Sequence, residues 1–368
     1  MKVLITGGPV FEYLDSVKIV TNRFKGGRIA ELADHIEDLG ATVTYLCSKD
    51  SVKPEYISGG VVYHNGYEDY RNQLLKLAPD YDAVILGAAV ANLIPDTPWK
   101  KTKFPSHDYN EGDRLSIDFV IAPRIINMIK GVAPKTTLIG FKLLNGVDHA
   151  ELVDAAYGTL VDSRATCVVA NDASNLDQKY IITKEKSVIP VKEQDLATFI
   201  MRTIRDKYFS TTIMDETFPT SYVNEALSVF KWARISYGAS LSGGKDETRG
   251  IMFGSIAVRH DDGFVISSRG KKDFAQKTYV SHVDHINDIV YVKGDKASLN
   301  APLIDKIFRS NHEIKSIVHY HKQYDSLPTL DYAFPGTTAD SCRKIPDRSF
   351  CIKHHGVFLL INKDGSEL

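Results

Sequence analysis

The chain has 368 residues, 43% of them hydrophobic and 25% charged, which is the composition of a soluble globular protein with two or three domains. With 45 Lys and Arg against 46 Asp and Glu, the net charge of −1 excludes strong long-range attraction to nucleic acid or to an anionic membrane. No apolar run is long enough to cross a membrane, and the opening apolar run is too short for a signal peptide. We therefore expect a cytoplasmic protein with neither nucleic acid nor membrane as a partner.

The first half of the sequence alternates short apolar runs with helical periodicity. Apolar residues at 29, 32, 33, 36 and 39 predict a helix over Arg28–Leu39, which ends before Gly40. A hairpin and a closing helix end this half. Parallel-type strands are predicted at Lys2–Thr6, Ala41–Cys47, Ala83–Leu86, Thr137–Phe141 and Thr166–Ala170, the hairpin at Tyr180–Thr183 and Ser187–Val191, and the closing helix at Asp195–Tyr208. This order is typical of a doubly wound (Rossmann-like) α/β domain with a ligand at the carboxyl ends of its strands.

The pattern loses its periodicity between Phe209 and Thr220, so we predict two domains, 1–212 and 213–368. The second half has the pattern of a mixed α/β domain with much antiparallel pairing. Its predicted elements are a helix at Tyr222–Ile235, a Gly-rich stretch at Gly238–Gly254, strands at Ser255–Arg259, Gly263–Ser267, Asp288–Val292, Ser316–His321 and Phe350–Leu360, and a helix at Ala301–Ser310. The four cysteines include no CxxC pair and are expected to be reduced and buried.

Gly7-Gly8-Pro9 follows the first predicted strand, where backbone N–H groups can approach a phosphate at a helix start. Glycine at this point is common in any such fold. The GxGxxG fingerprint is incomplete and no acidic residue ends the second strand, which argues against a dinucleotide-dependent oxidoreductase.

A series of segments in order carries more information than any one of them. The series is Val3–Pro9 with Asp15, Val20–Arg23, Gly26, Gly87–Ala91, Lys101–Lys103, Ile139–Leu143 and Val169–Ser174. Together these segments make the first half similar to phosphopantothenate–cysteine ligases. The resemblance implies a ligation in coenzyme A biosynthesis: a carboxylate attacks the α-phosphate of CTP or ATP, with Mg²⁺, and an amine such as cysteine then displaces the nucleotide. It also implies homo-oligomers.

The resemblance assigns roles to individual residues. Asn22 orients the acyl intermediate, and Lys101 or Lys103 contacts phosphate. The nucleotide-binding residues are expected to be Gly7, Gly8, Ala89, Asn92, Phe141, Lys142, Asn171 and Asp172. Taken singly, a solvated lysine pair, a turn-capping asparagine or a core phenylalanine explains such residues as well.

Two departures from the ligase pattern concern the substrate. The family's aspartate after Ala-Ala-Val-Ala is Asn92, and its Ser-Ser-Gly-Lys is replaced by residues 24–27. These changes favour an altered acyl partner more than a loss of nucleotide binding.

In the second half, His319 and His321 are two residues apart on a predicted strand, so their imidazoles lie on one face. With His355 ahead of the last apolar run they form a candidate site for Zn²⁺ or a similar divalent ion. Two histidines on a strand also occur without a metal.

This half resembles the class II aldolase/adducin family. The matching segments are Gly254–Arg259, Ser267–Gly270, Leu299–Ile304, Val318–His321 and His354–Gly356. The resemblance implies His319, His321 and His355 as metal ligands, and Ser268, Gly270 and Asn300 as further site residues.

Asn300 stands where that family has its acid/base glutamate, and an asparagine takes no proton at neutral pH. Orthodox aldol chemistry is therefore disfavoured, and epimerisation, dehydration or an adducin-like non-catalytic role remain open. Such domains usually continue into a helix beyond the point where this sequence stops, at Leu368.

The sequence as a whole predicts a nucleotide-dependent acid–amine ligase fused to a metal-binding domain. Small-molecule carboxylates and amines are its expected partners. A nucleotidyltransferase that releases a CMP- or AMP-activated product is the first alternative. A non-catalytic binding protein built from two degenerate enzyme domains is the second.

Overall fold

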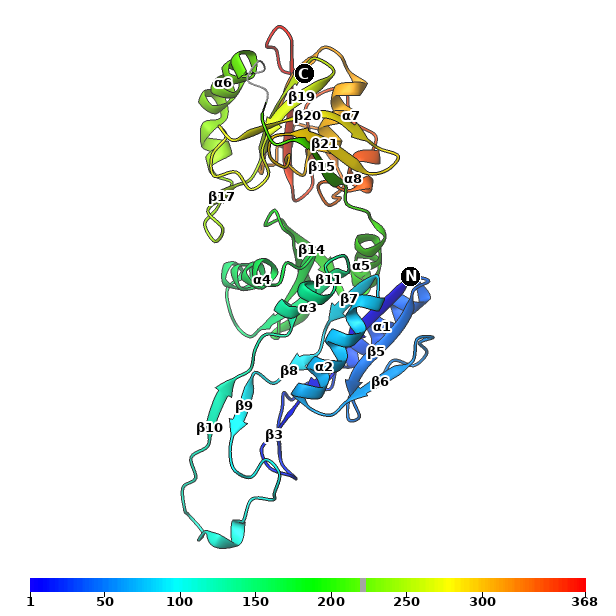
Figure 1. Cartoon of the computed structure of the whole chain (residues 1–368), viewed down its shortest axis with the longest axis vertical. Helices are drawn as coiled ribbons and strands as arrows, with labels where there is room; N and C mark the ends of the chain where they lie inside the picture. The colour runs from blue at the N-terminus through cyan, green and yellow to red at the C-terminus, as the bar shows by residue number, and fades with distance from the viewer. Residues whose placement is uncertain (219–222) are drawn as a thin grey trace. The chain divides into compact units, whose positions relative to one another are not determined.

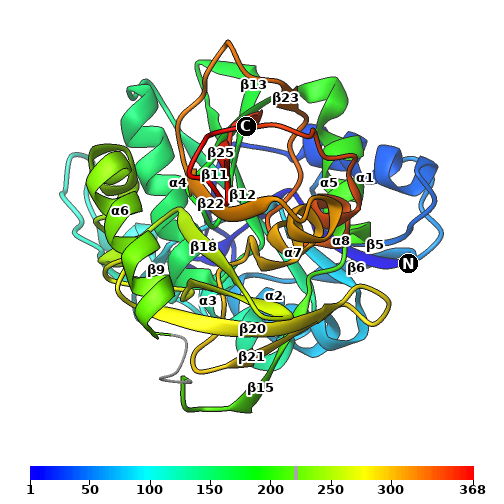
Figure 2. The same ribbon diagram turned by 90° about the horizontal axis from the view of Figure 1, so that it is seen from above.

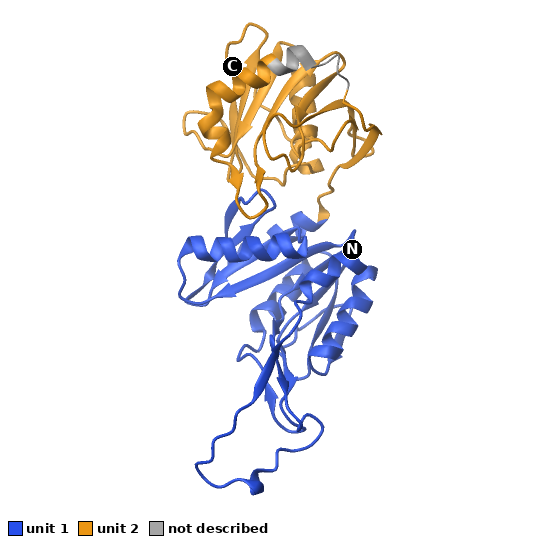
Figure 3. Ribbon diagram, turned by 60° about the vertical axis from the view of Figure 1, so that its left-hand side comes forward, with its two compact units in different colours: residues 1–204 blue, residues 205–368 orange. Residues whose placement is uncertain are grey.

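The computed structural model describes residues 1–218 and 223–368, which form two compact units, Met1–Ile204 and Arg205–Leu368 (Figure 3). The division lies between residues 204 and 205, ahead of the expected 212/213. The reason is strand β15 (Ser210–Asp215), which the sequence analysis treated as irregular. It pairs in parallel with β21 (Ile289–Lys293) and so belongs to the second unit.

An eight-stranded sheet forms the centre of the first unit, in the order β14-β13-β12-β11-β7-β1-β5-β6 (Figure 1). All neighbours from β12 to β6 are parallel, and β13 and β14 form the predicted antiparallel hairpin. The strands are β1 (Lys2–Thr6), β5 (Thr42–Ser48), β6 (Val61–His64), β7 (Ala83–Leu86), β11 (Thr137–Leu144), β12 (Cys167–Asp172), β13 (Asn175–Ile182) and β14 (Val188–Lys192). The predicted doubly wound fold is thereby confirmed.

The strand order reverses between β1 and β7, and such a switch point is where ligands of doubly wound sheets bind. Five helices connect or follow the strands. They are α1 (Gly27–Asp38), α2 (Tyr67–Leu77), α3 (Ile126–Val132), α4 (His149–Ser163) and α5 (Leu196–Arg205). Helix α1 buries the centre of the predicted apolar stripe, Leu32, Ala33 and Ile36, and ends ahead of Gly40, whose φ is 89°. Because α1 connects β1 to the parallel strand β5, its N-terminus lies at the carboxyl edge of the sheet.

Several small β-pairs lie beyond this edge. Strands β2 (Pro9–Val10) and β8 (Ala89–Val90) extend the paths of β1 and β7 as a parallel pair, and β3 (Glu12–Tyr13) pairs with β4 (Ile19–Val20). The antiparallel pair β9 (Leu93–Asp96) and β10 (Asp118–Ile121) projects away from the large sheet (Figure 1).

The second unit is built on a nine-stranded sheet in the order β15-β21-β20-β19-β18-β22-β25-β24-β23. Its centre is antiparallel, as predicted. The further strands are β18 (Ser255–His260), β19 (Gly263–Ser267), β20 (Lys277–Asp284), β22 (Ile314–Tyr320), β23 (Thr329–Leu330), β24 (Phe350–Ile352) and β25 (Gly356–Asn362). A separate two-stranded pair joins β16 (Lys245–Asp246) and β17 (Ile251–Met252).

Helices cover both faces of this sheet (Figure 2). Alternation along β18 puts Ala257 in the apolar cluster with helix α7 (Ala301–Ser310), whereas Ile256 and Val258 belong to the cluster with helix α6 (Val223–Ser242). The short helix α8 (Thr338–Cys342) packs beside α7. The α7 face is the one that carries the histidines described below.

Three expectations for this unit were wrong in detail. The run Phe350–Leu360 is two antiparallel strands joined by a turn, because His354 has φ 58° and breaks the extended backbone. Strand β22 ends at Tyr320, so His321 follows it, and α6 continues into the stretch predicted as a Gly-rich loop. Strand β20 was not predicted, and Tyr222 of the predicted helix lies outside the described residues.

None of the described helices combines the length and apolarity needed to cross a membrane. Cys47, Cys167 and Cys351 are buried and unpaired as expected, while Cys342 is exposed.

Candidate functional site

Two glycine pairs distant in sequence meet at the carboxyl edge of the first sheet. After Gly7-Gly8 the chain enters β2, and the helix start that was expected there comes only at Gly27. Gly26, with φ 85°, nevertheless lies so close to Gly8 that a Cβ on it would be 2.4 Å from the Gly8 nitrogen. Only glycine permits this approach. The two pairs form what we call the glycine turn, at the N-terminus of α1, where backbone N–H groups attract an anion.

Asn22 is fixed beside this turn. Its side-chain amide Nδ2 donates a hydrogen bond of 3.1 Å to the carbonyl oxygen of Ala89. The backbone N–H of Ala89 in turn donates to the carbonyl of Gly8. The structure thus joins Asn22, Ala89 and the glycine turn, all expected to belong to one site.

Lys101 and Lys103 lie in an exposed loop. The loop is fastened to the turn around Asp15, whose carboxylate accepts backbone hydrogen bonds from Lys18, Val17 and Phe104. These bonds, led by the one from Lys18, hold the pKa of Asp15 well below its usual range. Within the described part of the chain neither Lys101 nor Lys103 forms an ion pair, so their ammonium groups are available to a phosphate.

Phe141, Lys142, Asn171 and Asp172 come together on two adjacent parallel strands. Phe141 and Lys142 of β11 pair with Val169 and Ala170 of β12, and Asn171 follows directly. The Asn171 Oδ1 atom is buried and has no hydrogen-bond partner among the described residues. An unpaired buried amide oxygen of this kind is a candidate ligand contact.

Asp172 has a structural task that the sequence did not indicate. Its carboxylate accepts hydrogen bonds from the Ser174 backbone and hydroxyl and from the backbone of Gly146 and Val147. These bonds, those of Ser174 first, lower its pKa to about 2. Asp172 therefore stabilises the turns after β11 and β12. Asn92 is exposed, and its carbonyl accepts a hydrogen bond from Ala122 at the base of the β9–β10 hairpin.

In the second unit His319, His321 and His355 form one cluster. Each offers a ring nitrogen, and these three atoms lie within 4.8 Å of one another. The Nδ1 atom of His319 is 2.8 Å from the carbonyl oxygen of Val357, and a hydrogen bond donated there directs the lone pair of Nε2 away from it. Nε2 of His319 and both ring nitrogens of His355 are buried without partners in the described residues.

The fold forces these rings together. Gly356 starts β25 so close to β22 that a Cβ on it would be 2.2 Å from the carbonyl oxygen of Tyr320. His355, one residue earlier, is thereby brought to a ring distance of 4.5 Å from His319 and 5.2 Å from His321. Phe358 stacks on His319, and Phe253 stacks on His321.

The electrostatics of the cluster suit a metal ion. Burial lowers the pKa of His319 and of His355 far below the ordinary value, and burial with the charge of Lys271 lowers that of His321 to about 4. All three imidazoles are therefore neutral at pH 7, which is the form that binds a metal.

The other expected residues of this unit lie on neighbouring segments. Ser255, which was not among the expected residues, pairs with His319 across β18 and β22, so their side chains share a face. Ser268 forms an isolated antiparallel β-bridge with Ala297. Asn300, three residues after Ala297, lies at the N-terminus of α7. The side-chain oxygens of Ser255, Ser268 and Asn300 are buried without partners in the described residues, whereas Gly270 is exposed.

Residues 1–216 match the model of the family described as DNA/pantothenate metabolism flavoprotein C-terminal domain. The chain belongs to this family. The coenzyme A biosynthesis bifunctional protein CoaBC of Thermococcus kodakarensis is 30% identical over 172 residues, covering 46% of this chain and 41% of that protein. The chain thus spans less than half of the length of this relative.

Solved structures give weaker likenesses. The DNA/pantothenate metabolism flavoprotein from Streptococcus pneumoniae is 25% identical, covers 56% of this chain and 98% of its own, and gives a TM-score of 0.49. For the second unit, an L-fuculose-1-phosphate aldolase from Thermus thermophilus is 15% identical, covers 38% of this chain and 79% of its own, and gives a TM-score of 0.26.

The second unit contains a buried lysine, Lys271, that was not predicted from the sequence. Lys271 is 3% exposed, and its ammonium donates to the carbonyl oxygens of Met252 and Gly254 at 3.0 and 2.6 Å. Both carbonyls flank Phe253, the residue stacked on His321, so Lys271 supports one wall of the histidine cluster. A lysine four residues after a predicted strand carries no sequence signal of burial.

Proposed function

We propose that the family domain of this chain is a nucleotide-dependent ligase that activates a carboxylate with CTP or ATP and joins it to an amine. One observation carries the proposal. The glycine turn, Asn22 and Ala89 are joined by close contact and hydrogen bonds at the switch point of the sheet, within the segment that matches the family. That geometry supports polyphosphate at the N-terminus of α1 and an acyl group beside Asn22.

The proposed ligation proceeds in two steps. A carboxylate oxygen attacks the α-phosphorus of the nucleotide, forming the acyl–nucleotidylate as pyrophosphate leaves. An amine nitrogen then attacks the acyl carbon, giving the amide and the nucleoside monophosphate, and the amine loses its proton to the surroundings. Mg²⁺ supplies charge compensation for the phosphates when it is bound.

We propose the following roles for individual side chains. The Asn22 amide, already held by Ala89, orients the acyl group, and Lys101 or Lys103 reaches the departing pyrophosphate from its exposed loop. Phe141 and the unpaired Oδ1 of Asn171 contact the remainder of the nucleotide. Asp172 contributes by holding the turns that follow the strands of Phe141 and Asn171.

For substrates we propose phosphopantothenate or a related carboxylate, with cysteine or a similar amine. The relative from Thermococcus kodakarensis is named for coenzyme A biosynthesis, which supports this choice. The exposed Asn92 and the altered segment 24–27 are this chain's departures from the ligase pattern, and they favour a modified acyl partner.

For the second unit we propose a divalent metal, with Zn²⁺ as the best fit, held by His319, His321 and His355. Three neutral imidazoles, each offering a ring nitrogen within 4.8 Å of the others, fit a zinc site that keeps an open position. The metal would supply Lewis-acid polarisation of a carbonyl. Asn300 cannot transfer a proton, so epimerisation, dehydration or substrate binding is favoured over aldol cleavage.

We also propose that the chain forms homo-oligomers. In the β9–β10 hairpin, Phe119, Val120 and Ile121 are 41, 56 and 69% exposed, an apolar strand that a second copy of the chain can cover. Light scattering of the chain tests this, and a monomer at all concentrations would contradict it.

A pyrophosphate-release assay tests the ligase proposal. CTP and ATP are offered with a panel of carboxylates that includes phosphopantothenate, with and without cysteine. A ligase yields an amide and free nucleoside monophosphate only when the amine is present. Pyrophosphate release that ends in a stable CMP or AMP ester would identify a nucleotidyltransferase instead, and no release with any carboxylate would identify a binding protein.

A further inference from the structure

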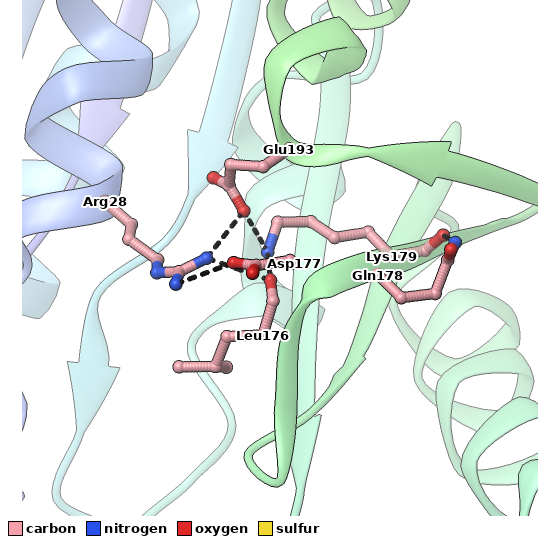
Figure 4. Close-up of polar contacts among 6 residues, drawn as sticks. All are labelled: Arg28, Leu176, Asp177, Gln178, Lys179 and Glu193. Atoms are coloured by element: carbon pink, nitrogen blue, oxygen red, sulfur yellow. Dashed lines mark hydrogen bonds and ion pairs between the residues drawn. The ribbon is translucent and has the colours of Figure 1, made fainter.

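Four charged side chains meet at the carboxyl edge of the first sheet (Figure 4). Arg28, the second residue of α1, donates from Nη1 to the carbonyl oxygen of Leu176 at 3.0 Å and to Glu193 at 3.1 Å, and from Nη2 to Asp177 at 3.0 Å. One guanidinium therefore connects α1 to two segments more than 140 residues away in the sequence.

Lys179 anchors the far side of this network. Its ammonium, 3% exposed, lies 2.7 Å from the same Leu176 carbonyl oxygen and 2.5 Å from the same Glu193 carboxylate. Burial alone would lower the pKa of Arg28, but the hydrogen bond with Asp177 and the charge of Glu193 raise it. The ion pair of Arg28 with Asp177 is largely exposed and contributes little to stability, so the effect of Arg28 lies in the segments that it connects.

The network joins two segments with different roles in the proposed ligase. Arg28 directly follows Gly26 and Gly27 of the glycine turn, which would bind the phosphates. Leu176 and Asp177 are the second and third residues of β13, and only a short turn separates β13 from the end of β12, which carries Asn171. Strands β7 and β11 separate β1 from β12 in the sheet, so the network spans the edge on which the nucleotide would lie.

We propose that Arg28 is a positioning residue that fixes the span between the phosphate-binding turn and the carboxyl end of β12, where Asn171 would contact the rest of the nucleotide. Its guanidinium is already engaged by two carboxylates, so it acts through the segments it connects. This inference rests on the proposed nucleotide-dependent function.

A positioning role has a specific signature, because a ligand that contacts both segments gains from their fixed distance and a fragment that contacts one does not. Loss of Arg28 should weaken binding of the intact nucleoside triphosphate. Binding of inorganic pyrophosphate alone, or of the nucleoside alone, should change little. A direct phosphate contact would weaken pyrophosphate as much as the triphosphate.

The experiment is calorimetric or NMR titration of the full chain with Mg²⁺ and CTP or ATP, with pyrophosphate and with the corresponding nucleoside. The variants are Arg28→Met, which leaves Glu193 paired with the buried Lys179, and Arg28→Lys, which keeps the charge but cannot bridge both carboxylates. Arg71→Met removes a comparable ion pair on α2 and is the matched control.

In Arg28→Met we expect triphosphate affinity to fall by about tenfold or more while the two fragments change by less than about twofold. Arg28→Lys should recover part of the loss, and Arg71→Met should bind as the wild type does. Equal losses for pyrophosphate and triphosphate, or no loss at all, would overturn the positioning role and leave the ligase proposal standing. A wild-type chain that binds neither triphosphate would refute both.

Discussion

Replacing Gly26 by alanine tests whether the glycine turn forms the nucleotide site. With φ at 85° the residue is in the left-handed region, which costs an alanine about 1–2 kcal/mol. The new Cβ would also lie 2.4 Å from the nitrogen and 2.6 Å from the Cα of Gly8, which are backbone atoms and cannot rotate away. We therefore expect the first unit to lose more than about 2 kcal/mol of stability, because the strain and the clash add.

The neighbouring Gly27 is the matched control for stability. It is the first residue of α1, and a Cβ on it would have no atom within 4 Å. Gly27→Ala should therefore leave stability unchanged or raise it by up to about 1 kcal/mol through helix propensity. Because the chain has only two tryptophans, a Trp232→Phe background leaves Trp99 to report urea unfolding of the first unit.

The same proteins are then titrated with CTP and ATP. Displacement of the turn by even a few tenths of an ångström disturbs its backbone N–H groups, so Gly26→Ala should lose at least about tenfold in nucleotide affinity. If Gly26→Ala is as stable as Gly27→Ala, or binds nucleotide as the wild type does, the close approach of the two glycine pairs has no part in the site.

Three further predictions concern single side chains. His319→Ala should abolish the binding of one zinc ion per chain, measured by elemental analysis after dialysis. Replacing the exposed His312 by alanine should leave zinc binding unchanged. Zinc retained by His319→Ala would contradict the proposed metal site. Asn22→Ala should lower the kcat of ligation on the order of a hundredfold with a smaller effect on the KM of the nucleotide, and the reverse split would show that Asn22 serves nucleotide binding. Burial lowers the pKa of Lys271 from 10.5 to about 7, so between these pH values the unfolded chain binds more protons than the folded chain and the free energy of unfolding rises with pH. Denaturation of the wild type should therefore show a gain of about 1.4 kcal/mol per pH unit relative to Lys271→Met. Parallel pH dependences of the two proteins would contradict this.

Much of the first unit follows from its sequence because apolar runs and helical periodicity directly record burial. Ala83–Leu86 was predicted to the residue, and the helix after the first strand within one or two. Strand β15 (Ser210–Asp215) was not predicted, because it is largely polar and lies at a sheet edge. It is defined by its pairing with β21 and not by apolar content. Neither its pairing nor the domain boundary has a local signal.

The candidate sites likewise contain residues that the sequence indicated and residues that it did not. Residue types and spacing indicated His319 and His321, whereas Asn22 was implied only by the resemblance of ordered segments to the ligase family. The closeness of Gly26 to Gly8 and the bridge from Arg28 to Asp177 depend on chain packing, and no spacing rule gives them. The buried state of Lys271 is likewise a tertiary effect.

The most direct test of the ligase proposal follows the oxygen atoms. Phosphopantothenate carrying ¹⁸O in its carboxylate is incubated with the chain, CTP or ATP, Mg²⁺ and cysteine, and the products are examined by mass spectrometry. Activation through an acyl–nucleotidylate transfers one labelled oxygen to the nucleoside monophosphate. Label in inorganic phosphate, or amide formed without labelled nucleoside monophosphate, would contradict the account.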